Sequence, residues 1–94
     1  ELRLQFERPY TVEIVGHTDD SPIHTPVMDS NWDLSATRSA RIARYMIERG
    51  IDSERISVVG KAHTEPLVPN RNSDGTPNLE NRSKNRRIQI KIEY

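Results

Sequence analysis

The chain has 94 residues, of which 33% are hydrophobic and 30% charged, and its 14 basic and 14 acidic residues cancel. This length predicts one domain over residues 1–94. Because the net charge is zero, no overall electrostatic field attracts the chain to nucleic acid or to an anionic membrane. The lack of cysteine excludes a disulfide framework and thiol catalysis, and no apolar run approaches the ~20 residues that span a bilayer.

The first residues alternate apolar and polar side chains, so residues 1–8 fit either a short strand or the end of a helix. Because the chain opens without a start methionine, we expect an excised domain whose upstream anchor or signal is missing. Residues 11–17 are β-branched and nearly continuously apolar, which predicts an interior strand. Residues 18–33 then form a polar loop of a length that is usually functional, with Trp32 as its expected apolar anchor.

A helix is predicted from Ser35, a good N-cap, to Gly50, which can end it in a left-handed conformation. The first part of its inward face is small, so the helix can approach a sheet closely. The face comprises Ala36, Ser39, Ala40, Ala43, Met46 and Ile47, with Ile42 at its flank.

The second half of the chain completes the fold. Residues 55–60 predict a strand, whose short distance from the helix favours a right-handed strand–helix–strand unit. A long polar loop follows over residues 61–79, with a helical turn at its end. Residues 87–93 alternate isoleucine with polar residues, as a strand with one wet face does. The sequence therefore predicts an α+β fold, a two-layer sandwich with a mixed β-sheet and helices on one face.

Two charged residues flank the first loop: Asp19 follows the strand and Arg38 lies in the first turn of the predicted helix. Across a small pocket they complement a zwitterion, because the carboxylate takes an ammonium and the guanidinium takes a carboxylate. A plain ion pair, or two unrelated surface charges, fits the same spacing.

Other chemistries find less support. The residue types of His17, Asp19 and His63 suit zinc, but no HxH or HxxxH pair is present and flexible loops would supply the ligands. Asp19 and Asp20 are adjacent and point in opposite directions on an extended chain, which does not suit a carboxylate hydrolase. The arginines of the helix resemble a solvated face. We predict no catalytic residue, no metal, no cofactor and no nucleic-acid partner.

Five blocks of sequence, in order, resemble the OmpA-like peptidoglycan-binding domain from about Val12 to Ile92. They are Val15-Gly16-His17-Thr18-Asp19, then Asn31-x-x-Leu34-Ser35-x-x-Arg38-Ser39, then Arg55-Ile56-x-Val58-x-Gly60, then Glu65-Pro66-Leu67-x-x-Asn70, then Asn81-Arg82-x-x-Asn85-Arg86-Arg87-Ile88-x-Ile90.

The resemblance implies non-catalytic binding of the diaminopimelate in the peptidoglycan stem peptide. By position, Asp19 would bind the ammonium and Arg38 the carboxylate. The other site residues that the resemblance implies are Asn31 lining the pocket, Arg87 near the ligand from across the sheet, and Thr18 and Leu34 shaping the wall. We expect the remaining charges of the first loop, Asp20 among them, to be solvated.

The long first loop and the phrases at residues 30–35 and 66–70 bring the chain closer to periplasmic domains of the flagellar motor protein MotB. This implies the periplasmic domain of an inner-membrane protein that anchors a motor stator to the cell wall. A stator partner subunit would join through a missing membrane segment, with a possible homodimer in the full protein.

Two alternatives stay open: an outer-membrane OmpA- or Pal-type peptidoglycan anchor, and a metal-dependent hydrolase using His17, Asp19 and His63. The sequence also departs from the family pattern. Asn81 stands at a usual glycine, Lys61 at a common aromatic position, and residues 71–79 are longer than usual. The family's first strand and most of its first helix are absent, and residues 1–8 would match the end of that helix.

Overall fold

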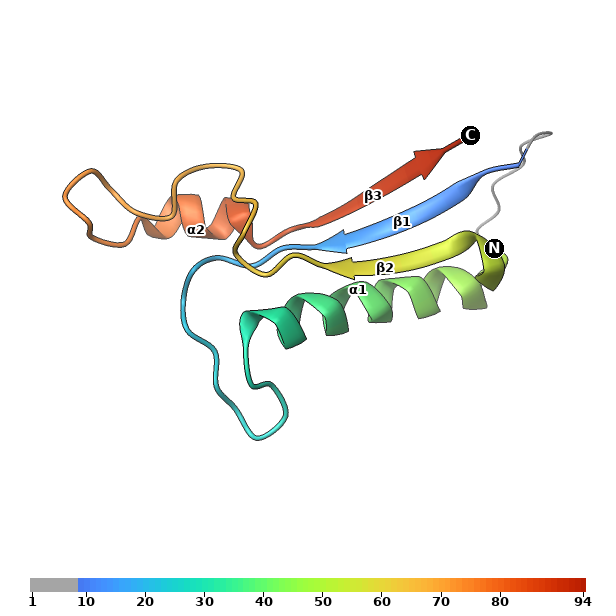
Figure 1. Ribbon diagram of the computed structural model, residues 1–94, viewed down its shortest axis with the longest axis horizontal. Coiled ribbons are helices and arrows are strands. Elements are labelled where there is room, and N and C mark those ends of the chain that lie inside the picture. The colour runs from blue at the N-terminus through green and yellow to red at the C-terminus, as the bar shows by residue number, and fades with distance from the viewer. Residues whose placement is uncertain (1–8) are drawn as a thin grey trace.

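The computed structural model describes residues 9–94, so the expectation for residues 1–8 falls outside the described part of the chain. Its elements are β1 (Thr11–Gly16), α1 (Asn31–Glu48), a 3-10 turn (Ser53–Arg55), β2 (Ile56–Gly60), α2 (Leu79–Asn85) and β3 (Ile88–Glu93). The central strand β1 runs parallel to β2 and antiparallel to β3. The predicted α+β fold with a mixed sheet is thus confirmed (Figure 1).

The core lies between the sheet and α1. Val12 and Ile14 of β1 are fully buried and cluster with Ala43 and Met46 of α1. Burying one such aliphatic side chain contributes about 1.5–3 kcal/mol. Val15, on the opposite face of the strand, is only 1% exposed, as the nearly continuous apolar run predicted for an interior strand. Of the described helices, none is long and apolar enough to cross a membrane.

The helix α1 begins four residues earlier than predicted. Ser30 is its N-cap, because the Ser30 hydroxyl accepts from the Asp33 N–H and donates to the Asp33 carboxylate. Ser35 is instead buried within the helix, where its hydroxyl donates to Trp32 O and accepts from Ala62 N–H. The expectation that Trp32 anchors the loop was also wrong, since its side chain lies in the first helical turn and is 52% exposed.

Two glycines let the start of α1 lie directly on the sheet. Gly16 and Gly60 face each other across β1 and β2. A Cβ on Gly16 would overlap the Ser35 carbonyl oxygen, and one on Gly60 would lie 2.8 Å from Ala36 N. Only glycine therefore permits this approach, which brings the start of α1 to the end of β1. At its other end, α1 stops before Gly50, whose φ of 111° confirms the predicted terminator.

The three isoleucines of β3 face the same side of the sheet as the core. Ile90 pairs with Ile14 and Ile92 with Val12. However, α1 packs on β1 and β2, so Ile90 and Ile92 stay 51% and 37% exposed. The edge strand β3 is therefore only partly covered by the helical layer.

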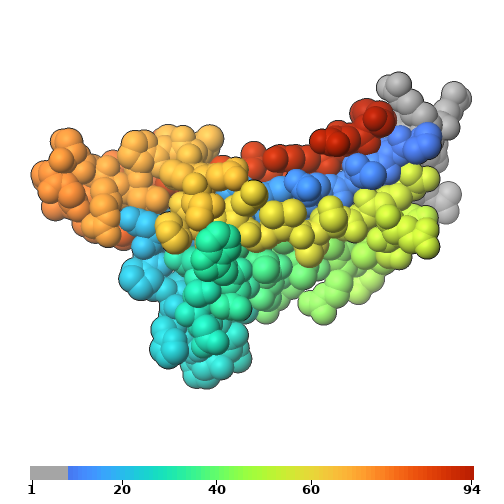
Figure 2. Space-filling model, in the orientation of Figure 1, coloured from blue at the N-terminus to red at the C-terminus, as the bar shows by residue number. Residues whose placement is uncertain are grey.

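The second helix, α2, lies beyond the end of the sheet rather than on its face (Figure 1). Asn85, with 0% exposure, connects it to the long loop before it. Its Oδ1 accepts from the Leu67 and Val68 N–H groups, and its Nδ2 donates to Val68 O and Asn70 Oδ1. Figure 2 shows this orange loop and the cyan first loop as two lobes projecting from the same end of the molecule. The polar residues of the two loops therefore lie at the same end of the molecule.

Candidate functional site

The site is built around Asp19, just past the end of β1. The Asp19 side chain is 9% exposed. One carboxylate oxygen accepts from the Ser21 N–H at 2.8 Å and the other from Arg86 Nη1 at 2.6 Å. Burial favours the neutral acid, but the hydrogen bond from Ser21 and the guanidinium of Arg86 outweigh it and hold the pKa of Asp19 below its usual value. Asp19 is therefore an anion at neutral pH.

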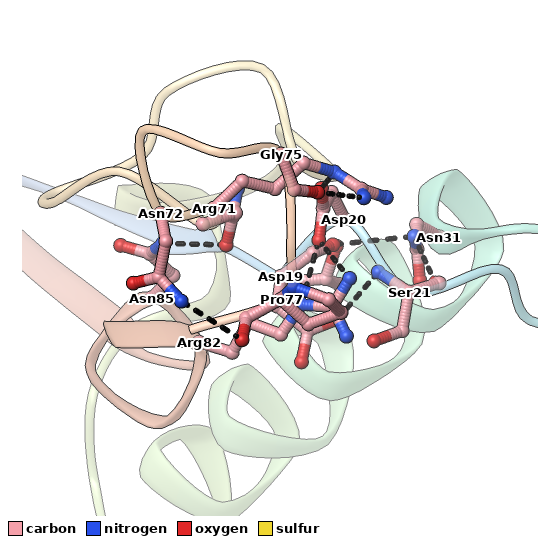
Figure 3. A network of polar contacts seen from close by, with 12 residues as sticks. Asp19, Asp20, Ser21, Asn31, Arg71, Asn72, Gly75, Pro77, Arg82 and Asn85 are labelled. Atoms are coloured by element: carbon pink, nitrogen blue, oxygen red, sulfur yellow. Dashed lines mark hydrogen bonds and ion pairs between the residues drawn. The ribbon is translucent and has the colours of Figure 1, made fainter. Parts of the chain in front are cut away.

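Asn31 joins the start of α1 to this loop. Its Nδ2 donates to Ser21 O at 2.9 Å and to Asp19 O at 3.3 Å (Figure 3). Its Oδ1 is buried and has no hydrogen-bond partner among the described residues. Thr18 is also buried, with its hydroxyl donating to Asp19 O and its N–H donating to Ala62 O. The position of Asp19 is thus fixed by backbone contacts on both sides.

Arg38 lies on α1 and is exposed, without a hydrogen bond or ion pair to any residue from 9 to 94. Asn31, Leu34 and Arg38 are spaced three and four residues apart and so lie along one side of the helix. Leu34 is half-buried. The ion pair of Asp19 and Arg38, which the spacing alone allowed, does not form in the described structure, and the guanidinium stays available.

The two arginines before β3 have separate roles. Arg87, expected near the ligand, donates to Glu65 O at 3.1 Å and to Asn85 O at 3.4 Å. Its neighbour Arg86 instead makes the ion pair with Asp19. Sequence reasoning missed Arg86, although a signal was present: Arg82 and Arg86 are four residues apart and therefore share one helical face.

The adjacent acid, Asp20, was predicted to be solvated, and this was wrong. Its side chain is 20% exposed and bridges Arg82 at 2.7 Å and Arg71 at 3.0 Å (Figure 3). Two consecutive acids after β1 thus pair with arginines four residues apart: Asp20 with Arg82 in α2, and Asp19 with Arg86 just after α2. The contact was not predictable because it needs α2 to lie against the end of the sheet.

The residues proposed for zinc do not assemble. Among residues 9–94, no group of three or more His, Cys, Asp or Glu side chains is placed to hold a metal. His17 is 2% exposed and its Nε2 donates to Gln89 Oε1 at 2.6 Å. Burial is the main reason that the pKa of His17 is lowered. His63 is exposed on the following loop. His17 is thus a buried neutral histidine.

A hollow of about 300 Å³ opens beside this group of residues. Its wall includes Asp20, Asn31, Trp32 and His63. It lies between the first loop and the start of α1, so Asn31 belongs both to this wall and to the contacts that fix Asp19. The end of the molecule that carries the charged residues is therefore also concave.

The sequence model of the OmpA family matches residues 2–90. The chain belongs to the OmpA family. This membership confirms the resemblance seen in the five sequence blocks. As an OmpA-family chain, it is a structural domain and not an enzyme.

Two relatives show which members of the family this chain is similar to. Motility protein B of Bacillus subtilis (strain 168) is 34% identical over 95% of this chain and 32% of its own length. The peptidoglycan-binding protein ArfA of Mycobacterium tuberculosis (strain CDC 1551 / Oshkosh) is 36% identical over 86% of this chain and 22% of its own length. This OmpA-family chain thus spans less than a third of either relative.

A solved structure gives the same placement. The crystal structure of the C-terminal domain of Helicobacter pylori MotB matches with a TM-score of 0.78 at 29% identity. The match covers 90% of this chain and 60% of that one. The fold of this OmpA-family chain is therefore that of the MotB periplasmic domains.

Proposed function

We propose that the chain binds peptidoglycan non-covalently, through the diaminopimelate of the stem peptide, and so anchors a flagellar motor stator to the cell wall. The proposal is supported by membership of the OmpA family and by the similarity to a motility protein and to a peptidoglycan-binding protein. The side chain of diaminopimelate ends in an ammonium and a carboxylate on one carbon, so its receptor needs one group of each charge.

The observation that carries this proposal is the difference in burial and pairing between Asp19 and Arg38. Asp19 is a buried anion held in place by its neighbours, and Arg38 is an exposed cation without a described counter-ion. Buried charges are normally paired and surface charges are normally solvated, so a buried anion together with an exposed guanidinium that has no described counter-ion suits a zwitterionic ligand.

Each site residue then has a role. Asp19 receives the ligand ammonium, and Arg38 binds the ligand carboxylate through paired charge-assisted hydrogen bonds. Asn31 lines the pocket, and its Nδ2 holds the loop that carries Asp19. Arg87 borders the ligand from the side of β3. The remaining wall of the pocket is shaped by Thr18 and Leu34.

In the whole protein, the chain would be the periplasmic part of an inner-membrane protein. A membrane segment would join it to the stator partner subunit and permit a homodimer. The alternative is an outer-membrane anchor of the OmpA or Pal type, which would use the same pocket. The sequence upstream of Glu1 separates the two: a single apolar helix of ~20 residues supports the stator, whereas β-barrel strands or a lipidated cysteine support the alternative.

Cosedimentation with purified sacculi tests the pocket. Arg38→Ala should lose nearly all pelleting, because removing one partner of a buried charged contact costs about 2–5 kcal/mol. Arg44→Ala is the matched control, since Arg44 is also an exposed arginine of α1 but lies six residues after Arg38 and so on another side of the helix. Pelleting of Arg38→Ala equal to that of Arg44→Ala would contradict the assignment.

A further inference from the structure

In the described structure, the guanidinium of Arg86 forms an ion pair with the carboxylate of Asp19. Its Nη1 donates to Asp19 Oδ2 at 2.6 Å, and this is the only hydrogen bond that the Arg86 side chain makes to any residue from 9 to 94. The Arg86 side chain is 46% exposed although its partner is almost fully buried. Its Nε and Nη2 groups therefore have no hydrogen-bond partner among the described residues, and the side chain is accessible to a ligand.

The neighbouring arginines differ in this respect. Arg82 binds Asp20 through both Nε and Nη2 and is 12% exposed. Arg87 donates from two nitrogens to backbone carbonyls. Both are held by the fold, whereas Arg86 is held by one contact at the proposed ammonium position. Arg86 is thus the arginine of this cluster that a ligand can most easily recruit.

An ammonium that approaches Asp19 must compete with Arg86 for the same carboxylate. If the ligand carries an ammonium alone, two cations share one anion and repel each other. If the ligand also carries a carboxylate on the same carbon, the displaced guanidinium finds a new partner there, through the paired geometry that arginine and carboxylates favour. For the zwitterionic ligand, the displaced Arg86 shares the ligand carboxylate with Arg38, whereas a plain amine brings no anion to receive it.

We propose that Arg86 is a specificity-determining residue that makes the pocket reject a plain amine and accept an ammonium with an adjacent carboxylate. The inference rests on the proposed function and adds to it. Arg38, on α1, binds the ligand carboxylate. Arg86 leaves Asp19 readily only when the ligand also carries this carboxylate. The consequence is discrimination between stem peptides that contain diaminopimelate and those that contain lysine, whose side chain ends in an ammonium alone.

The test compares two synthetic tripeptides, L-Ala-γ-D-Glu-meso-diaminopimelate and L-Ala-γ-D-Glu-L-Lys, by NMR titration of the purified chain. The unaltered chain should bind the first in preference to the second. In Arg86→Gln, affinity for the diaminopimelate peptide should fall about tenfold or more, as expected for a lost hydrogen bond between charged groups. Affinity for the lysine peptide should stay the same or rise, because the competing cation is gone.

The decisive quantity is therefore the ratio of the two affinities. Arg44→Gln removes an exposed arginine on another side of α1 and should leave the ratio unchanged. Arg86→Lys keeps the charge without the planar fork and should also lower the ratio, which covers the case that Arg86→Gln does not fold. An unchanged ratio in a folded Arg86 variant would overturn the inference alone. Binding of neither peptide by the unaltered chain would overturn the proposed function and the inference together.

Discussion

Asp19 and Asp20 are neighbours in the sequence, yet the two regions around them are organised differently. Around Asp20, both carboxylate oxygens receive an arginine, one from Arg82 and one from Arg71. Around Asp19, one backbone N–H and one half-exposed guanidinium are the partners. Arg38, the other charged residue proposed to bind the ligand, has no described partner at all. The Asp20 region is saturated with internal contacts, and the Asp19 region is not.

The difference separates a structural contact from a binding site. A saturated network rigidifies the protein because each member would be costly to leave unpaired. In contrast, a site must keep donors and acceptors that the protein does not itself consume. Arg86 illustrates the second case, since its side chain makes one described hydrogen bond, to Asp19, and is 46% exposed. The saturated Asp20 region then serves to hold the Asp19 region in place.

The largest expected effect is on sacculus binding, when the charge of one of the two acids is removed at a time. Asp19→Asn should reduce sacculus binding by about 2–5 kcal/mol, because the ligand ammonium loses its buried counter-ion. Asp20→Asn, an equally small change one residue away, should leave binding within about threefold, a difference of less than 1 kcal/mol. Cosedimentation over a range of sacculus concentrations measures both, and equal losses would remove the distinction between the two regions.

A smaller effect is expected on the free energy of unfolding, and here the contacts of Asp20 matter. Arg82→Ala removes a guanidinium that is 12% exposed and should cost about 1–3 kcal/mol of unfolding free energy, as for other charged hydrogen bonds. Arg71→Ala is the matched control on the same acid, and because Arg71 is 52% exposed it should cost less than about 1 kcal/mol. Urea denaturation followed by circular dichroism gives both values. Similar costs for the two variants would mean that burial does not decide the strength of this network.

The smallest expected effect is a change of stability with pH, and it depends on the buried residue His17. Burial lowers the pKa of His17, although the Gln89 hydrogen bond and Glu65 oppose the shift while Arg87 and Lys91 add to it. The unfolded chain therefore binds a proton at His17 more tightly than the folded chain does. Its contribution to stability is complete above a pH of about 6.5 and declines as the pH falls below that value.

Urea denaturation at pH 7.5, 6.5 and 5.5 measures this decline. His17→Gln should flatten the decline, while His63→Gln, which alters an exposed histidine, should leave it unchanged. At more acidic pH a second loss should follow, because the pKa of Asp19 is also lowered and its charged form stabilises the fold. A decline that persists in His17→Gln would assign the first loss to another group.

The sequence by itself determined the order and type of the elements, because hydrophobic periodicity reports directly on which side chains are buried. The alternation in β3 and the apolar run of β1 each predicted the observed strands. Gly50 marked the end of α1 for an equally local reason. The start of α1 was misjudged because two serines five residues apart both qualify as N-caps, and only the Asp33 contact decides for Ser30.

The five blocks of sequence also determined the family and the choice of Asp19 and Arg38 as candidate residues. Only the tertiary structure decided which arginine meets which acid. Arg82, Arg86 and Arg87 are equally basic in the sequence, and their partners depend on how α2 lies against the end of β1. An ion pair between residues 67 positions apart is a property of packing, which local patterns do not encode.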